Sequence, residues 1–74
     1  MNDRWDIEEA NQVLGAALAE IDGICDKLSP ARAEALLDEF EQDVGRAFLR
    51  KDMSAVKTTC EVYQRRFRLL SEDE

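Results

Sequence analysis

The fold is decided by residues 24–40, ICDKLSPARAEALLDEF, where one helical pattern stops and another begins. Ser29 is a preferred N-cap residue because its hydroxyl can accept a hydrogen bond from an otherwise unpaired amide. Pro30 suits the first helical position, where its missing amide hydrogen costs nothing, and it disfavours a helical conformation at Ser29. The pair predicts that a first helix ends near Leu28 and that a second begins at Pro30.

Before this junction, apolar residues recur at alternating three-residue and four-residue steps, which places them on one face of a helix. We therefore expect a first helix over residues 6–28. Its main stripe consists of Ile7, Ala10, Leu14, Ala17, Ile21, Ile24 and Leu28. Val13, Leu18 and Cys25 widen this stripe, and a wide stripe is typical of a helix with two neighbours.

After the junction, the same spacing predicts helices over residues 30–50 and 53–70. The second stripe is formed by Ala33, Leu37, Phe40, Val44 and Ala47, and the third by Met53, Val56, Cys60, Tyr63, Phe67 and Leu70. Lys51 and Asp52 are expected to form the turn between these two helices. A cation is favourable at the C-terminal end of a helix, and an aspartate can cap the N-terminal end of the helix that follows. Residues 71–74 are polar, and we expect them to form a frayed acidic tail.

Two short connections between three helices make successive helices run antiparallel. We therefore expect an all-α fold, a three-helix up-down-up bundle that forms one domain over residues 1–74. A chain of 74 residues buries only about 60% of the surface that its unfolded form exposes. Dimerisation is one way to complete such a small core.

Charge and hydropathy disfavour several classes of partner. The net charge is −7, and an acidic protein is repelled by nucleic-acid phosphates and by anionic lipid. No run approaches the ~20 apolar residues that a membrane span needs. Residues 1–15 lack the basic start and apolar run of a signal peptide. We expect a cytoplasmic protein with no membrane contact, for which nucleic acid is a disfavoured partner.

Residues that commonly carry chemistry are few. The chain has two cysteines and no histidine, which is the commonest general base in catalysis. Two cysteines cannot complete the four-ligand set of a structural zinc site. Cys25 and Cys60 fall towards opposite ends of antiparallel helices, too far apart for a disulfide, and we expect reduced, buried thiols. The sequence therefore predicts a protein that is not an enzyme and holds no cofactor or metal.

Candidate partner-binding residues lie beside the main stripes. Gly15 and Gly45 are expected inside helices, where each costs about 0.8–1 kcal/mol relative to alanine. The antiparallel hairpin brings them to a similar level, on the side that carries Leu18 and Phe48. One interpretation is a shallow apolar groove that another helix approaches closely. The alternative is that the glycines are tolerated on a surface.

Four more apolar residues are candidates for a partner-binding surface. Trp5 precedes the first helix and acts either as a hydrophobic staple that covers the open end of the bundle or as an exposed anchor for a partner. Leu49, Val62 and Leu69 fall outside the main stripes. A dimer surface that collects these three residues is a hypothesis worth testing.

Arg65, Arg66 and Arg68 form the only dense basic cluster in the sequence. One interpretation is a patch that contacts phosphate or an acidic partner. The alternative is that the arginines pair with the acidic half of the second helix, because charge runs on helices are usually solvated faces. The acidic residues concerned are Glu34, Asp38, Glu39 and Glu41.

Residues 40–70 also resemble a known family. A helix from Phe40 into an acidic turn, then Ala55-Val56 and the segment Tyr63-Gln-Arg-Arg-Phe-Arg-Leu-Leu70, is similar to the C-terminal three-helix domain of J-protein co-chaperones for iron–sulfur cluster assembly. In that family the domain binds the cluster scaffold protein, so the resemblance implies protein binding. Stimulation of an Hsp70 chaperone is not implied, because the chain has no J domain and no His-Pro-Asp motif.

The leading hypothesis is a small non-catalytic helical protein–protein interaction module. It would serve as an adaptor or accessory subunit that binds another protein, expected to be helical, through its first and third helices, or that binds a second copy of itself. Two alternatives remain open. One is a nucleic-acid-associated regulator of phage or plasmid type that uses the three arginines, and the other is a chaperone-like accessory domain.

Overall fold

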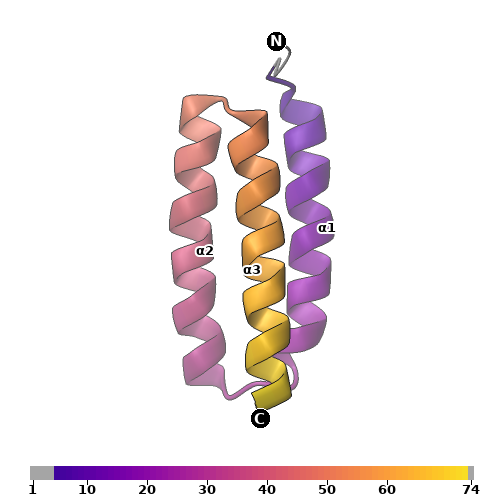
Figure 1. Cartoon of the computed structure of the whole chain (residues 1–74), viewed down its shortest axis with the longest axis vertical. Helices are drawn as coiled ribbons and strands as arrows, with labels where there is room; N and C mark the ends of the chain where they lie inside the picture. The colour runs from indigo at the N-terminus through magenta and orange to yellow at the C-terminus, as the bar shows by residue number, and fades with distance from the viewer. Residues whose placement is uncertain (1–4, 74) are drawn as a thin grey trace.

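The computed structural model describes residues 5–73, which form three helices in an up-down-up antiparallel arrangement (Figure 1). They are α1 (Ile7–Cys25), α2 (Pro30–Arg50) and α3 (Met53–Asp73). No strand occurs in this part of the chain. The expectation of an all-α three-helix bundle is confirmed.

The first helix is shorter than its apolar spacing predicts. Its N-cap is Asp6, whose Oδ1 accepts hydrogen bonds from the amides of Glu8 and Glu9 at 3.0 and 3.2 Å. The helix ends at Cys25, three residues before the predicted end. Leu28 is still buried, because the tight turn after α1 folds it back onto the core. An apolar spacing that continues into a turn therefore made the predicted helix too long.

The second helix begins at Pro30, as the sequence predicts. Ser29 is extended, with φ −64° and ψ 142°, and it occupies the N-cap position. Its side chain makes no capping hydrogen bond, contrary to the expected role of its hydroxyl. The restricted backbone that proline imposes is therefore what marks the start of α2.

The turn between α2 and α3 is a Schellman motif. The amide of Asp52 donates to the carbonyl of Ala47 at 3.2 Å, and the amide of Lys51 donates to that of Phe48 at 3.0 Å. Lys51 adopts the left-handed conformation, with φ 55°. Asp52 Oδ1 then accepts a hydrogen bond from the amide of Ala55 at 3.1 Å, which confirms its predicted role as the cap of α3.

The third helix continues through residues 71–73, where the sequence suggested a frayed tail. Leu70 packs against the core, and this contact holds the C-terminal end of α3 against the other helices. Serine, glutamate and aspartate are compatible with one further helical turn, so polarity alone did not mark the end of the helix. Glu74 lies outside the described residues.

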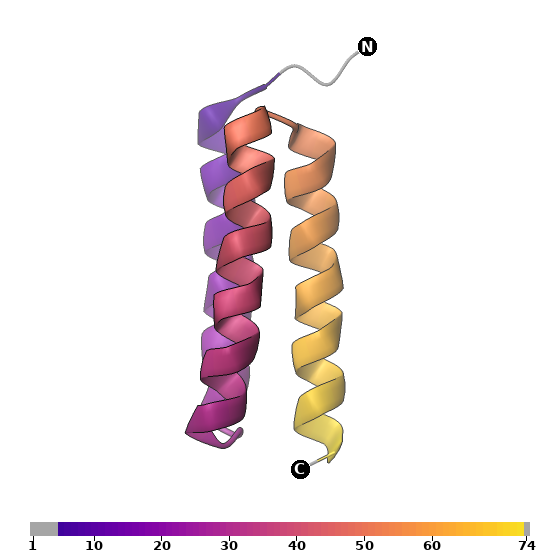
Figure 2. The ribbon, with the colours of Figure 1, turned by 90° about the vertical axis from the view of Figure 1, so that its left-hand side faces the viewer.

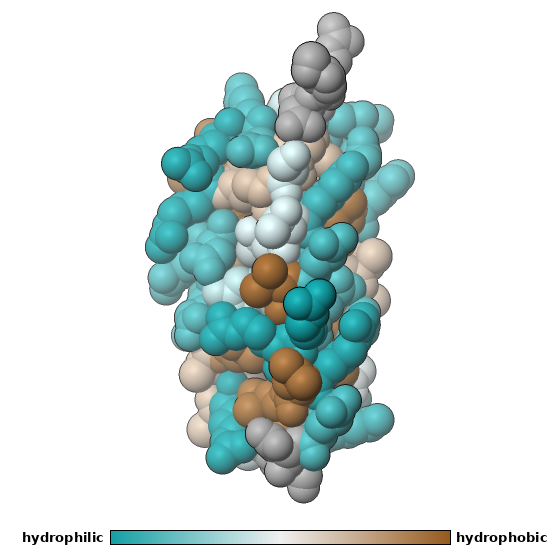
Figure 3. All heavy atoms as spheres, in the orientation of Figure 1, coloured by the Kyte–Doolittle hydropathy of each residue, from teal (hydrophilic) through white to brown (hydrophobic). Residues whose placement is uncertain are grey.

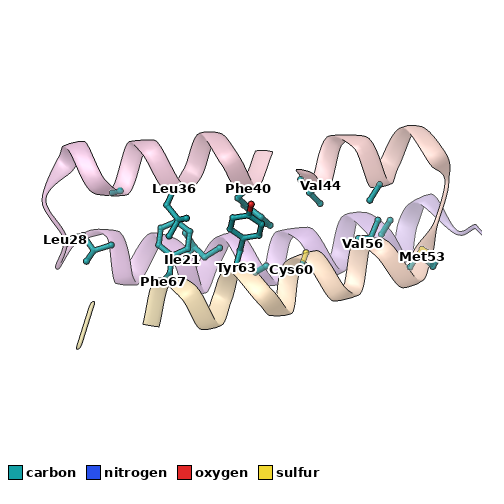
Figure 4. Packing of buried hydrophobic residues seen from close by; sticks show 14 residues of the cluster. Ile21, Leu28, Leu36, Phe40, Val44, Met53, Val56, Cys60, Tyr63 and Phe67 are labelled. Carbon is teal, nitrogen blue, oxygen red and sulfur yellow. The ribbon is translucent and has the colours of Figure 1, made fainter. Parts of the chain in front are cut away.

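Helix α3 is the centre of the bundle. Figure 1 shows α3 between α1 and α2, whereas in the turned view of Figure 2 α1 and α2 both lie to one side of α3. Both helices pack extensively on α3 while touching each other only slightly. Four large core side chains are fully enclosed, namely Ile21, Phe40, Val56 and Phe67. In Figure 4 Phe40 meets Tyr63, with ring centroids 5.2 Å apart. Helices α1 and α2 are consequently the least closely packed pair of the bundle.

Within residues 5–73, none of the three helices combines the length and the apolar character that crossing a membrane requires.

Candidate functional site

The side of the bundle between α1 and α2 leaves apolar side chains partly uncovered. Leu14 and Leu18 of α1 and Leu37 and Phe48 of α2 pack against the core, yet they remain only half-buried. They are half-buried because α1 and α2 have little mutual contact to enclose them. We name these four residues the α1–α2 seam.

The contacts of α1 with α3 fix which edge of α1 faces α2. Glu9 and Glu20 both bond to side chains of α3. Leu14 and Leu18 lie on the opposite edge of the apolar stripe, because successive residues of a helix are rotated by about 100°. The same geometry holds in α2, where Asp43 bonds to α3 and Leu37 lies on the other edge.

Acidic side chains border the seam on both helices. Helical spacing places Asp22 and Asp26 beside the seam on the α1 side, and Glu34 and Glu41 beside it on the α2 side. All four residues are exposed, and none of them forms an ion pair with another described residue. Burial raises the pKa of the nearby Cys25 thiol, and the charges of Asp22 and Asp26 raise this pKa further. The border of the seam is therefore negative.

Trp5 covers one end of the seam. Its ring meets Phe48 edge to face, with centroids 5.5 Å apart and planes inclined by 83°. Trp5 is half-buried against the core. This arrangement agrees with the interpretation in which Trp5 covers the open end of the bundle, although its partner is on α2 rather than within α1.

The glycines beside the seam are not required by the packing of this chain. Gly15 is exposed and Gly45 is half-buried. A Cβ atom added to either glycine would meet nothing within 4 Å. The structure thus places both on the side that carries Leu18 and Phe48, as expected, but above open space rather than at a close helix contact.

Leu49, Val62 and Leu69 do not gather into one surface. Leu69 lines a hollow of about 470 Å³ between α2 and α3, together with Leu36 and Leu70. Val62 lines a second hollow further along the same pair of helices, and Leu49 lines neither. Figure 3 looks onto α3, where hydrophobic patches are divided by hydrophilic side chains. The three exposed residues therefore offer separate contacts.

Tyr63 links α3 to α2 through a polar contact at the edge of the core. Its hydroxyl donates to Asp43 Oδ2 at 2.5 Å and lies 3.4 Å from Glu39 Oε1. The pKa of Tyr63 is raised from 10.0 to about 12, mainly by burial and secondly by the hydrogen bond to Asp43. The guanidinium of Arg66 lies 5.0 Å from the centre of the tyrosine ring. These contacts orient α2 and α3 relative to each other.

The three arginines of the predicted basic patch point in different directions. Arg66 Nη1 lies 3.3 Å from Glu39 Oε1 on α2. Among the described residues, Glu39 is the only one of the four predicted acidic partners that pairs with these arginines. Arg68 Nε lies 2.6 Å from Glu20 Oε2 on α1, and this bond lowers the pKa of Glu20. Arg65 is exposed and forms no ion pair with the described residues. Positions 65, 66 and 68 lie on different faces of one helix, so they do not form a single patch.

The bond between Arg68 and Glu20 was not foreseen from the sequence. Gln64 Nε2 also donates to Glu20, at 2.9 Å, so one carboxylate of α1 holds two side chains of α3. Gln64 and Arg68 are four residues apart, which places them on the same helical face. That spacing is the signal in the sequence, but it does not identify the partner on α1.

Neither cysteine is part of a reactive group. Cys25 is half-buried and Cys60 is buried, and both thiols are free. The free thiols confirm the expectation that no disulfide joins them, whereas full burial of Cys25 was predicted wrongly. Burial raises the pKa of Cys60 and so disfavours the reactive thiolate. Among the described residues, no group of three or more cysteine, aspartate or glutamate side chains is arranged to hold a metal ion.

Comparison with known proteins gives no match to this chain among protein-family models, curated proteins or solved structures.

Proposed function

We propose that this chain is a small non-catalytic protein–protein interaction module, an adaptor or accessory subunit that works in the cytoplasm. The observation that carries the proposal is the α1–α2 seam. Four large apolar side chains there remain half-buried on two helices that barely touch each other. An apolar strip shared by two helices is a surface on which an amphipathic helix of a partner can dock.

The energy available at the seam is sufficient to matter. Fully burying a leucine or phenylalanine side chain contributes about 1.5–3 kcal/mol relative to leaving it exposed. At most about a third of each seam side chain is uncovered, so covering the rest of Leu14, Leu18, Leu37 and Phe48 contributes less than about 1 kcal/mol for each residue. A partner that covers the seam would also stabilise the fold, because it binds the folded state alone.

Self-association is a second candidate, supported by a separate observation. Val62 is 45% exposed and Leu69 is 56% exposed, both beside hollows between α2 and α3. A second copy that covers them would form a dimer. Light scattering during size exclusion, over a range of protein concentrations, tests this candidate. A constant monomer mass would exclude it.

The regulator and co-chaperone alternatives receive less support. Two of the three arginines that would contact phosphate are already engaged by Glu39 and Glu20. The net charge of −7 opposes binding to nucleic acid as well. A chaperone-like role requires a specific scaffold or chaperone as the partner, which the experiment below would identify.

The proposal is tested by a tagged pull-down from the native host, analysed by mass spectrometry. The wild-type chain is compared with Leu18→Gln/Leu37→Gln, which makes the seam polar, and with Val62→Gln/Leu69→Gln on the other side of the bundle. Circular dichroism verifies that all three proteins are folded. A partner enriched by the wild-type chain and lost with one of the two double variants supports the proposal. A monomer that enriches no protein specifically would contradict it.

A further inference from the structure

Charge is distributed unequally among the three sides of the bundle. Side-chain ion pairs cross the α1–α3 side, where Lys57 meets Glu9 at 3.1 Å and Arg68 meets Glu20 at 2.6 Å. The α2–α3 side has the pair between Arg66 and Glu39. Among the described residues, no ion pair crosses the α1–α2 side.

The cations within α1 and α2 avoid the α1–α2 side, and Lys27 lies in the turn at its end. Helix α1 contains no lysine or arginine between Ile7 and Cys25. Arg32, Arg46 and Arg50 of α2 all line the hollows between α2 and α3. The α1–α2 seam is therefore an apolar strip with a negative border and no positive charge of its own helices beside it.

We propose that the α1–α2 seam binds an amphipathic helix whose apolar face is flanked by lysine or arginine. This inference rests on the proposed function and specifies its partner. The apolar face would cover Leu18 and Leu37, and the cations would meet Asp22 and Asp26 on one border and Glu41 on the other. Complementary charges of this kind favour the right partner and set its orientation.

A second copy of this chain does not suit the seam. Two copies joined through this side would bring their acidic borders together, and like charges across an interface are unfavourable. The length of the strip also determines the length of the partner helix that it can bind. From Glu34 to Phe48 the seam and its acidic border follow α2 for about 21 Å, which corresponds to a partner helix of about 14 residues.

Two designed peptides test the charge of the partner. Both are about 18 residues long, carry the same leucines at helical spacing and contain no tryptophan, but one has lysine at the flanking positions and the other glutamate. Binding is followed by the fluorescence of Trp5, the only tryptophan of the chain, whose ring meets Phe48 at the end of the seam. Calorimetry gives an independent affinity.

We expect the basic peptide to bind at least about tenfold more tightly than the acidic one. Its affinity should fall several-fold when salt is raised from about 0.05 to about 0.5 M, because salt screens exposed charges. Equal affinity for the two peptides, or an affinity that salt leaves unchanged, would overturn the inference.

Matched variants test the location. Asp22→Asn/Glu41→Gln removes two charges from the border of the seam, whereas Glu61→Gln/Glu72→Gln removes two exposed charges from α3. Both doubles change the net charge by the same amount. We expect the first double to weaken the basic peptide about three-fold to tenfold and the second to leave its affinity close to wild type. If the two double variants weaken the basic peptide equally, the peptide is attracted by the net charge of the protein rather than by the acidic border of the seam.

Failure of this inference is distinguishable from failure of the proposed function. A native partner that is retained by Leu18→Gln/Leu37→Gln and lost with Val62→Gln/Leu69→Gln would leave the interaction module intact. It would overturn the assignment of the seam. Loss of the basic peptide with Leu18→Gln/Leu37→Gln, and retention with the other double, is the result that supports the inference.

Discussion

Lys51 is the one described residue, glycines aside, with a positive φ, and it forms the turn between α2 and α3. The left-handed conformation costs a residue with a side chain roughly 1–2 kcal/mol. Glycine avoids this cost but loses about 0.5–1 kcal/mol through the greater freedom of its unfolded chain. We therefore expect Lys51→Gly to raise the free energy of unfolding by about 0.5–1 kcal/mol, measured by urea denaturation.

The control for Lys51 is a glycine placed where the backbone is an ordinary helix. Arg65→Gly in the middle of α3 should lower the free energy of unfolding by about 0.7 kcal/mol. If Lys51→Gly destabilises the protein as much as Arg65→Gly does, the strain assigned to the turn is wrong.

Tyr63 makes stability depend on alkaline pH. The pKa of Tyr63 in the folded protein, about 12, exceeds the ordinary value of 10.0. Its contribution to stability is therefore fully present below pH 10 and is lost as the pH rises from about 10 to about 12. We expect wild-type protein to lose more stability than Tyr63→Phe between about pH 9 and about pH 11, because other alkaline titrations are common to both. Parallel urea-denaturation profiles for the two proteins would refute this role.

At the scale of the elements, three glycines lower the stability of α1 and α2. Gly15, Gly23 and Gly45 each have open space where a Cβ would lie. Alanine at each position should raise the free energy of unfolding by about 0.8–1 kcal/mol. Thermal denaturation should show an increase in Tm of roughly 4–8 °C for each kcal/mol.

The same substitutions separate stability from binding. Gly23 lies away from the seam on the outer face of α1, so Gly23→Ala is the control for Gly15→Ala. Both variants should become more stable, and a change in the affinity of a seam partner is expected for Gly15→Ala alone. Lower stability in either variant would mean that α1 is strained at that glycine.

Particular residues show how far the sequence predicts these elements. The apolar spacing and Pro30 gave the number of helices and the start of α2 correctly. Leu28 misled the prediction, since a buried leucine in a turn continues the same spacing as one in a helix. The missing cap at Ser29 depends on a side-chain rotation that local sequence does not encode.

The candidate site was predictable in part for a physical reason. Leu18 and Phe48 stood beside the main stripes, so their place at the edge of the helices follows from helical geometry alone. The negative border required knowledge of which helices touch. Glu9 and Glu20 form ion pairs with α3, and this contact shows that Asp22 lies on the other edge of α1, beside the seam.

At the scale of the whole molecule, the core is small, so each fully buried side chain contributes a large share of the free energy of unfolding. Phe67 is fully buried on α3, whereas Leu69, two residues later, is 56% exposed. Replacing a buried phenylalanine by alanine costs about 3–5 kcal/mol. We expect Phe67→Ala to be largely unfolded at 25 °C by circular dichroism, because small domains have little stability in excess of that amount.

Leu69→Ala is the matched substitution for Phe67→Ala. It removes an exposed apolar side chain from the same helix and should change the free energy of unfolding by less than about 0.5 kcal/mol. A folded Phe67→Ala, or an unfolded Leu69→Ala, would contradict the division of α3 into an enclosed face and an open one.

The central position of α3 has a consequence for synthesis on the ribosome. Because α1 and α2 barely touch, the nascent chain has no stable core after both of them have emerged, and their apolar faces stay open. At about 5–20 residues per second, translation of the 21 residues of α3 takes roughly 1–4 seconds. During this interval α1 and α2 lack the helix on which both of them pack, so their apolar faces are accessible to proteases and chaperones until α3 is available.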